Sequence, residues 1–258
     1  MILDEIVNHK RKEIEILKKK RKSEGFQKPL RDKRGKFLFY EALSSAADIA
    51  VIAEIKRRSP SRGVLRKDFN PVVLARDLEA GGAAALSVLT DKKFFGGSLE
   101  ILKKVRGATR LPILRKDFIL DECQIYEAAA AGADAVLLIA AILTGEELAD
   151  LSELASTLGL SVLFEAHDKR DMSKILPLKP SIVGINNRDL KTFRVDLKTT
   201  EELAGMLPEE TLLVSESGIL TRGDIDRLKR SGARAILVGE SLMRTKNVTE
   251  GLRDLLRG

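Results

Sequence analysis

The 258-residue sequence predicts an α/β protein, a closed (β/α)8 or TIM barrel with an N-terminal helical extension. From about residue 48 onward one unit recurs: an apolar run, a turn, an amphipathic segment and a glycine, about every 26 residues. The runs are rich in Val, Ile, Leu and Ala without strict polar alternation, which is typical of parallel strands covered by helices. Eight such units in about 210 residues favour the closed barrel, and an open doubly wound sheet, which usually has fewer strands, is the alternative.

Eight apolar runs are the predicted strands, taken in chain order. They are residues 49–55, 84–90, 111–118, 135–141, 161–167, 181–187, 211–217 and 235–239.

The segments between the runs carry helix signals. Thr144 with Glu147, and Thr221 with Asp224, have the spacing of capping boxes at the starts of helices 144–159 and 221–233. The joints that lead from helix to strand resemble one another, and each contains a glycine that can take the left-handed conformation at a helix end: EAGGAAALSV, AAGADAVLLI and RSGARAILVG.

The first 47 residues lie outside the repeat. Apolar residues at roughly helical spacing among many charges predict an amphipathic helix: Ile2, Ile6, Ile14 and Leu17. A basic loop over 23–37 and a second short helix over 39–47 follow. We therefore predict two parts, an extension of residues 1–47 packed on the barrel and a catalytic barrel of residues 48–258.

The net charge of +7 is confined to the N-terminal arm. Residues 1–36 contain 13 Lys and Arg against 6 Asp and Glu, whereas the rest of the chain holds 32 of each. A basic arm can bind nucleic acid, or it can be a solvated helical face that directs positive potential toward an anionic site. No aromatic residue for base stacking occurs in residues 1–25, so we favour the second interpretation and expect no nucleic-acid partner.

Composition excludes other classes of protein and site. No apolar run reaches the roughly 18 residues that a membrane helix needs, and the N-terminus lacks the features of a secretory signal, which predicts a cytoplasmic protein with no membrane partner. The lone Cys123 excludes an internal disulfide and, with only His9 and His167, the usual Cys/His zinc cages. With so few Cys and His residues, catalysis is expected to come from Lys, Glu, Asp, Asn and Ser or from a bound cofactor. No nucleotide-binding fingerprint occurs.

Charged residues gather where the apolar runs end. Four of them lie at or just beyond the ends of the first, third, fifth and seventh runs: Lys56, Lys116, Glu165 and Glu216. Because the layers inside such a barrel come from alternate strands, these four side chains are expected at one level of the C-terminal face, where barrel active sites lie. Any one of them alone fits a solvated rim position equally well; together, two amines and two carboxylates favour acid–base chemistry.

Two places favour phosphate binding. The segment 56–63 supplies donors after the first strand: Arg57, Arg58, Ser59 and Ser61. SESG at 215–218 and VGES at 238–241 supply glycines that let backbone N–H groups approach an anion, after the strands where this fold often binds phosphate. The alternative is that Gly218 and Gly239 are turn glycines only.

A few other residues stay open between two roles. His167 is expected to be a loop residue rather than a catalyst. Arg188 and Asp189 either contact substrate or brace a loop, and Phe94 and Phe95 either line the site or pack.

Eight motifs follow one another along the chain: AEIKRRSPSRG, SVLT, LRKDFI, LLIAAIL, LFEAHD, GINNRDL, SESGI and VGESLM. In this order they resemble the indole-3-glycerol-phosphate synthase family, and the resemblance covers nearly the whole chain. The resemblance implies a carboxy-lyase of tryptophan biosynthesis that needs no cofactor or metal. It closes the indole ring of 1-(2-carboxyphenylamino)-1-deoxyribulose 5-phosphate with loss of carbon dioxide and water.

The resemblance also implies roles for individual residues. Lys116 would protonate the substrate ketone, Glu165 would be the base in the dehydration, and Lys56, partnered by Glu54, would bind the substrate carboxylate. Asn186 and Glu216 would bind substrate hydroxyls and belong to the charge network. The residues that match the family's phosphate site are Ser59, Ser217, Gly218, Gly239 and Glu240. The phosphate contact of Arg58 stays open because the family varies at this position.

The family's N-terminal extension covers the barrel mouth and lines the pocket for the aromatic ring, so residues 1–47 would do so here, in a monomer.

One rival function is another phosphate-binding barrel such as a phosphoribosyl isomerase, but those rely on Cys/Asp or Asp/Asp pairs, and this chain offers Lys and Glu. A second rival is a catalytically silent barrel whose basic arm binds RNA.

Overall fold

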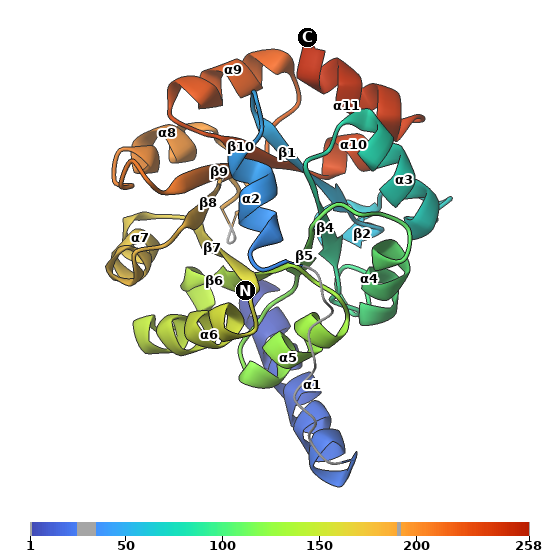
Figure 1. Cartoon of the computed structure of the whole chain (residues 1–258), viewed down its shortest axis with the longest axis vertical. Helices are drawn as coiled ribbons and strands as arrows, with labels where there is room; N and C mark the ends of the chain where they lie inside the picture. The colour runs from blue at the N-terminus through green and yellow to red at the C-terminus, as the bar shows by residue number, and fades with distance from the viewer. Residues whose placement is uncertain (1, 25–34, 190–191, 258) are drawn as a thin grey trace.

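The computed structural model describes residues 2–24, 35–189 and 192–257, and within them eight parallel strands close into a barrel (Figure 1). Strand β1 pairs with β4 on one side, through Ile52 and Ala85, and with β10 on the other, through Ala50 and Ala235. The predicted barrel is therefore confirmed, and the open sheet is excluded. Its strands are β1 (Ala50–Ile55), β4 (Ala85–Leu89), β5 (Ile113–Lys116), β6 (Ala135–Ile139), β7 (Ser161–Ala166), β8 (Ile182–Asn186), β9 (Leu212–Glu216) and β10 (Ala235–Val238).

Helices surround the barrel in the order expected for β/α units, with two short 3-10 turns, η1 (Ala140–Ile142) and η2 (Leu176–Leu178). Both predicted capping boxes form, at Thr144 with Glu147 and at Thr221 with Asp224. The helices are α3 (Pro71–Gly81), α4 (Leu99–Arg106), α5 (Glu122–Ala130), α6 (Gly145–Thr157), α7 (Lys169–Ile175), α8 (Lys198–Ala204), α9 (Arg222–Arg230), α10 (Glu240–Arg244) and α11 (Val248–Arg257). The glycines of the three helix-to-strand joints have φ of 100°, 85° and 92°, at Gly82, Gly132 and Gly232.

The alternation of side chains along each strand divides the buried residues into two cores. On β1, Val51 and Ala53 face outward into the core shared with the helices, whereas Ala50 and Ile52 face into the barrel. The next inward position is Glu54, which continues the same series. The barrel interior is thus apolar through its lower layers and becomes polar at the C-terminal ends of the strands.

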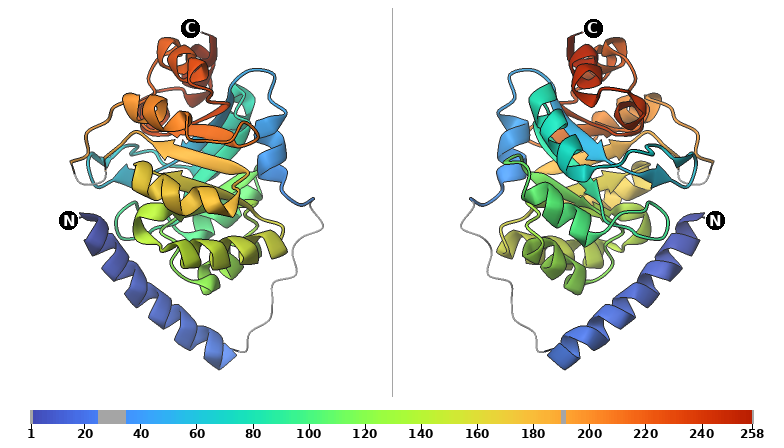
Figure 2. Two further views of the ribbon diagram at one scale, coloured as in Figure 1. Left: turned by 90° about the vertical axis from the view of Figure 1, so that its left-hand side faces the viewer. Right: turned by 90° about the vertical axis from the view of Figure 1, so that its right-hand side faces the viewer.

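Helix α2 (Leu38–Ser44) closes the N-terminal end of the barrel. Phe39 and Leu43 are buried among the inward-facing strand residues, such as Leu163 and Leu212. The helix begins one residue before the predicted segment 39–47 and ends three residues before its end. Figure 2 shows α2 at one end of the barrel and the start of the first helix, α1, at the other.

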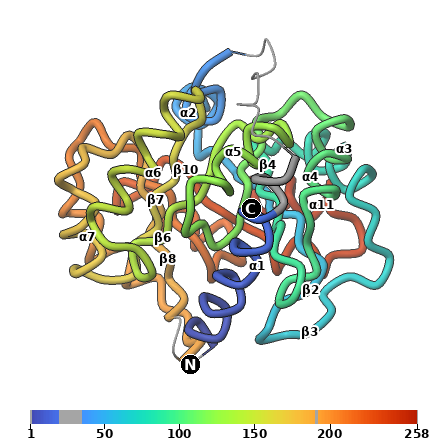
Figure 3. The backbone as a smooth tube through the Cα atoms, turned by 90° about the horizontal axis from the view of Figure 1, so that it is seen from below, coloured from blue at the N-terminus to red at the C-terminus, as the bar shows by residue number. Residues whose placement is uncertain are grey.

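Helix α1 (Ile2–Glu24) lies along the molecule beside α5, as seen from below in Figure 3. Ile6 and Ile14 are buried, and Lys18 pairs with Asp121 at 2.5 Å. The helix extends to Glu24, so the start of the predicted basic loop at residue 23 was wrong, and residues 25–34 of that loop lie outside the described residues. The boundary at residue 47 stays a prediction.

The first βα loop contains a short antiparallel pair that the sequence did not indicate, β2 (Arg58–Ser59) with β3 (Gly63–Val64). Cys123 lies on α5 and is buried, in agreement with a structural role. None of the described helices is both long and apolar enough to cross a lipid bilayer.

Candidate active site

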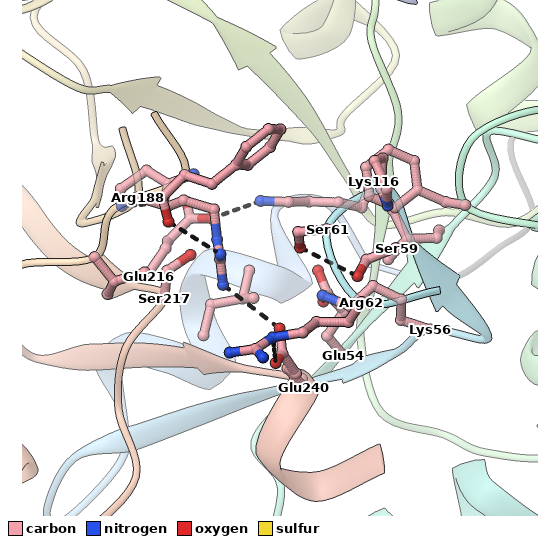
Figure 4. Close-up of a pocket in the computed structure, with 18 of the residues that line it drawn as sticks. Glu54, Lys56, Ser59, Ser61, Arg62, Lys116, Arg188, Glu216, Ser217 and Glu240 are labelled. Carbon is pink, nitrogen blue, oxygen red and sulfur yellow. Dashed lines mark hydrogen bonds and ion pairs between the residues drawn. The ribbon is translucent and has the colours of Figure 1, made fainter. Parts of the chain in front are cut away.

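A cavity of about 740 Å³ opens at the C-terminal ends of the strands (Figure 4). Its lining comes from the ends of the barrel strands, the loops after them and the start of α1. Arg57 and Arg58 do not line it. The other catalytic and phosphate-binding candidates named from the sequence do: Glu54, Lys56, Ser59, Ser61, Lys116, Glu165, Asn186, Arg188, Glu216, Ser217, Gly218, Gly239 and Glu240.

Lys116 lies between two carboxylates at the floor of this cavity. Its Nζ is 3.0 Å from Glu165 Oε2 and 2.5 Å from Glu216 Oε2, and all three side chains are mostly buried. They come from β5, β7 and β9, each at an inward-facing position near the C-terminal end of its strand. The register of alternate strands therefore brings one amine and two carboxylates to the same level.

These three groups share charge and differ in proton affinity. Burial alone lowers the pKa of Lys116, but the negative charges of Glu165 and Glu216 outweigh it and raise that pKa. Burial has the opposite effect on a carboxyl group and raises the pKa of Glu165, but the positive charges of Lys116 and His167 outweigh it and bring that pKa below its usual range. Burial and the neighbouring Glu165 keep the pKa of Glu216 raised in spite of Lys116. Two carboxylates with opposite shifts are typical of sites that need both a base and a proton donor.

Glu216 has one oxygen without a hydrogen-bond partner among the described residues, Oε1. This oxygen lies against Gly184 of β8, and a Cβ at that position would overlap it. A glycine is therefore required beside Glu216 if the carboxylate is to turn inward.

Lys56 and Glu54 form a second ion pair at the wall of the cavity. Lys56 Nζ is 2.5 Å from Glu54 Oε2, and the lysine lies just beyond the end of β1. Gly239 leaves the space that the Glu54 carboxylate occupies, since a Cβ there would overlap it. The pair places a cation at the cavity beside Lys116 without burying an isolated charge.

Asn186, the last residue of β8, and Asn187, the residue after it, have different contacts. Asn186 lines the cavity, and its Oδ1 accepts the backbone N–H of Arg188 at 3.0 Å. Asn187 is buried outside the cavity lining and donates to Ser215 Oγ of β9 at 2.9 Å and to the carbonyl of Ser217 at 3.1 Å, so it braces the start of the loop after β9.

The rim on the other side of the cavity is rich in donors. Ser217 and Gly218 have φ of 67° and 83°, so the backbone turns sharply after β9. The Glu240 carboxylate, at the start of α10, is 3.2 Å from Arg62 Nε and 3.5 Å from Arg188 Nη2 (Figure 4). This carboxylate holds the two guanidinium groups at the rim.

The family model for indole-3-glycerol phosphate synthase matches residues 3–255. The chain belongs to this family. The indole-3-glycerol phosphate synthase of Acetivibrio thermocellus is 44% identical over 263 residues, which covers 98% of each chain. That of Rhodopirellula baltica is 50% identical over 218 residues, which covers 84% of each. The resemblance that the motifs indicated is confirmed.

A solved structure shows the barrel in a more distant protein. Thiamine phosphate pyrophosphorylase from Pyrococcus furiosus superposes with a TM-score of 0.62, over 81% of this chain and 94% of its own, at 17% sequence identity. At that identity the likeness extends to the fold alone.

The structure gives a position to Arg58, whose contact the resemblance to indole-3-glycerol phosphate synthases left open. Arg58 does not line the cavity: its guanidinium donates to the carbonyls of Lys92, at 3.4 Å, and Lys93, in the loop after β4. The hairpin of β2 and β3 turns it there. Arg62, on the same loop, faces the cavity, and the sequence analysis did not single it out although it directly follows the Pro-Ser pair.

An apolar wall completes the cavity of this synthase-family barrel. Ile2, Leu3 and Ile6 of α1 lie on it with Phe95 and Phe118, whose ring centroids are 6.1 Å apart. The start of α1 therefore forms part of the cavity wall.

The other residues left open by the sequence now have places. Phe94 packs its ring edge-on against His9, with centroids 5.9 Å apart. Asp189 accepts the N–H of Thr192 at 2.7 Å and so braces its loop, while Arg188 lines the cavity. His167 directly follows β7, as expected, but it is largely buried and faces Glu165.

Proposed function

We propose that this protein converts 1-(2-carboxyphenylamino)-1-deoxyribulose 5-phosphate to indole-3-glycerol phosphate, carbon dioxide and water, as a carboxy-lyase of tryptophan biosynthesis. The observation that carries the proposal is Lys116 between Glu165 and Glu216 at the floor of a cavity with a cationic rim. Membership of the family supplies the reaction.

Ring closure needs an acid at the ketone of the substrate. As the aryl carbon attacks, the carbonyl oxygen gains charge, and a positioned donor stabilises it. Lys116 is that donor in our proposal: its raised pKa keeps it protonated, and the two carboxylates hold its Nζ in one place.

Lys56 binds the substrate carboxylate in the proposed complex, with Glu54 fixing its position. A carboxylate that leaves as carbon dioxide must not be stabilised too strongly before the reaction, because only interactions stronger in the transition state accelerate it. A single lysine binds a carboxylate less tightly than a bidentate arginine would, which suits this step.

The phosphate group lies, in our proposal, at the rim formed by Ser59, Ser217, Gly218, Gly239 and Glu240. Backbone N–H groups of the loops after β9 and β10 supply donors for a dianion. The Glu240 carboxylate would repel phosphate, so this residue would donate through its backbone. We expect the phosphate to compete with the Glu240 carboxylate for Arg62 and Arg188, with which this carboxylate pairs.

The aromatic ring of the substrate packs, in the proposed complex, on the apolar wall that α1 contributes through Ile2, Leu3 and Ile6. The basic excess of the arm then supplies positive potential beside a site for an anionic substrate. We expect a cytoplasmic monomer that uses no cofactor or metal and has no nucleic-acid or membrane partner.

The deciding experiment mixes the purified protein with the carboxyphenylamino-deoxyribulose phosphate and follows the appearance of indole absorbance and fluorescence. Turnover without added metal or cofactor supports the proposal. No turnover, together with salt-dependent retention of RNA, would favour the silent RNA-binding barrel instead.

Glu165→Gln is expected to slow dehydration by about 10²- to 10⁴-fold, the usual contribution of general acid–base catalysis, because the amide cannot accept the proton. Substrate affinity should change little. Rapid-quench analysis should show the ring-closed, decarboxylated intermediate accumulating. A variant that forms product at the wild-type rate across the pH range would remove Glu165 from the role of base.

A further inference from the structure

The side chain of His167 lies between Glu165 and a second buried carboxylate, that of Asp171. Its Nε2 is 3.4 Å from Glu165 Oε1, and its Nδ1 is 3.4 Å from Asp171 Oδ2. The imidazole is only 12% exposed, and both carboxylates are more deeply buried still. The proposed function gives this histidine no role, although it contacts the oxygen of Glu165 that Lys116 does not hold.

Asp171 is fixed by the backbone at the start of α7. Its Oδ2 accepts the N–H of His167 at 3.0 Å, and its own N–H donates to Oδ1 of the helix N-cap, Asp168, at 2.8 Å. The carboxylate therefore cannot move away from the imidazole without disrupting the first turn of the helix. A buried carboxylate in such a place needs a cation or several donors.

The two contacts of the ring are at ion-pair distance, but neither ring nitrogen makes a well-aligned hydrogen bond. A neutral imidazole has one N–H and can donate to only one of the two carboxylates, whereas an imidazolium donates to both. Burial lowers the pKa of His167, but the close contact with the Asp171 carboxylate and the negative charge of Glu165 outweigh it and raise that pKa. The surroundings thus favour the doubly protonated ring.

We propose that His167, as an imidazolium bridging Asp171 and Glu165, is a positioning residue that orients the catalytic base and whose deprotonation sets the alkaline limit of the dehydration step. Lys116 holds Oε2 of Glu165 and His167 holds Oε1, so the carboxylate is fixed at both oxygens. This inference rests on the proposed role of Glu165.

The charged groups around the ring come from several elements. Glu165 lies on β7, Asp171 on α7 and Glu216 on β9, and all three favour the protonated ring. The Lys116 ammonium of β5 partly neutralises the charge of Glu165 and so disfavours the protonated ring. Its charge is divided between Glu165 and Glu216, which weakens this effect. As the pH rises through the raised pKa of His167, the ring loses one proton and can donate to only one of the two carboxylates. When Asp171 keeps that donor, the Glu165 carboxylate is held at Oε2 alone.

A direct test is possible because the chain has only two histidines. NMR of protein labelled at the histidine ring carbons should show a titrating signal of His167, assigned by its loss in His167→Gln. We expect His167 to titrate above the ordinary 6.5, and Asp171→Asn to lower its midpoint while His9 stays unchanged as the internal control. A midpoint at or below 6.5, or one that Asp171→Asn leaves in place, would overturn the bridge.

The catalytic part is tested by pH profiles. The glutamine of His167→Gln retains an amide donor but cannot become a cation. We expect kcat to fall about tenfold, the lower end of the cost of removing a residue that orients a catalytic group without contacting the substrate, and KM to stay nearly unchanged. The alkaline limb of kcat should disappear in this variant and move to lower pH in Asp171→Asn. His9→Gln, on α1 and outside the cavity lining, is the matched control and should keep the wild-type profile.

The outcomes separate the two proposals. An inactive wild-type protein would refute the proposed function, and with it the catalytic role of His167, whereas the NMR titration would still decide the bridge. An active His167→Gln enzyme that retains the wild-type alkaline limb would refute the positioning role alone. Thermal unfolding of each variant shows whether a loss of activity is a loss of structure.

Discussion

Lys116→Met is expected to lower kcat by about 10³- to 10⁴-fold, at the upper end of what a single general acid contributes. Methionine fills a similar volume but has no proton for the substrate ketone. Single-turnover kinetics should show that ring closure, the first chemical step, is abolished. Binding of substrate, followed by equilibrium dialysis, should persist because Lys56 and the phosphate rim are intact.

The loss of this cation has a structural effect that must be separated from the chemical one. Without Lys116, Glu165 and Glu216 face each other in a buried site, so one of them is expected to take up a proton. The double variant Lys116→Met, Glu216→Gln removes that repulsion and should regain stability without regaining activity. Lys103→Met, at an exposed lysine of α4, is the matched control and should leave kcat unchanged. Near wild-type turnover in Lys116→Met would show that Lys116 is not the general acid of ring closure.

The clustering of the catalytic groups was predictable because it follows from the period of a strand. Leu163 and Leu212 face into the barrel, so Glu165 and Glu216, two and four residues further on, must do so too. The closed barrel then brings residues from alternate strands to one level. Neither step needs any knowledge of loops, which is why apolar patterning alone was sufficient.

The loops followed no such rule. Arg58 and Arg62 have the same chemistry and lie four residues apart, and only the conformation of the β2–β3 hairpin decides which one reaches the cavity. That conformation depends on contacts with the loop after β4, where carbonyl groups accept from Arg58. A turn set by distant backbone atoms leaves no local signal in the sequence.

Lys10 is the clearest residue that the sequence could not identify. It is one of many charges on an amphipathic helix, yet it is 4% exposed and its Nζ lies 3.1 Å from Asp91 and 2.9 Å from Asp117. Both aspartates belong to loops far along the chain. Glu13 lies three residues further on the same helix, 2.7 Å from Lys10, and this spacing in the sequence indicates an ordinary surface ion pair. It gives no sign of the long-range contacts with the two aspartates.

Lys10→Met is expected to lower the free energy of unfolding by about 3–5 kcal/mol, the usual cost of removing one partner from a buried ion pair. Burial lowers the pKa of Lys10, but the charges of Asp117 and Asp91 outweigh it and raise that pKa. The amine therefore stabilises the fold at every pH below its ordinary 10.5, and this contribution is lost only as the pH rises through the raised folded value. Urea unfolding at neutral pH measures the loss, and Lys12→Met, at an exposed lysine of the same helix, should stay within about 0.5 kcal/mol of wild type.

The pH dependence of that loss distinguishes an ion pair from simple packing. Burial raises the pKa of Asp117, but Arg115 and Lys10 outweigh it, so its stabilising effect is present above the ordinary 3.8 and is lost as the pH falls through the lowered value. Without Lys10 the pKa of Asp117 should rise, and the difference between variant and wild type should shrink as acid neutralises the aspartates. A difference below about 1 kcal/mol at neutral pH, or one independent of pH, would contradict the buried pair. Because α1 also contributes Ile2, Leu3 and Ile6 to the cavity, the folded variant should show a higher KM with a smaller change in kcat.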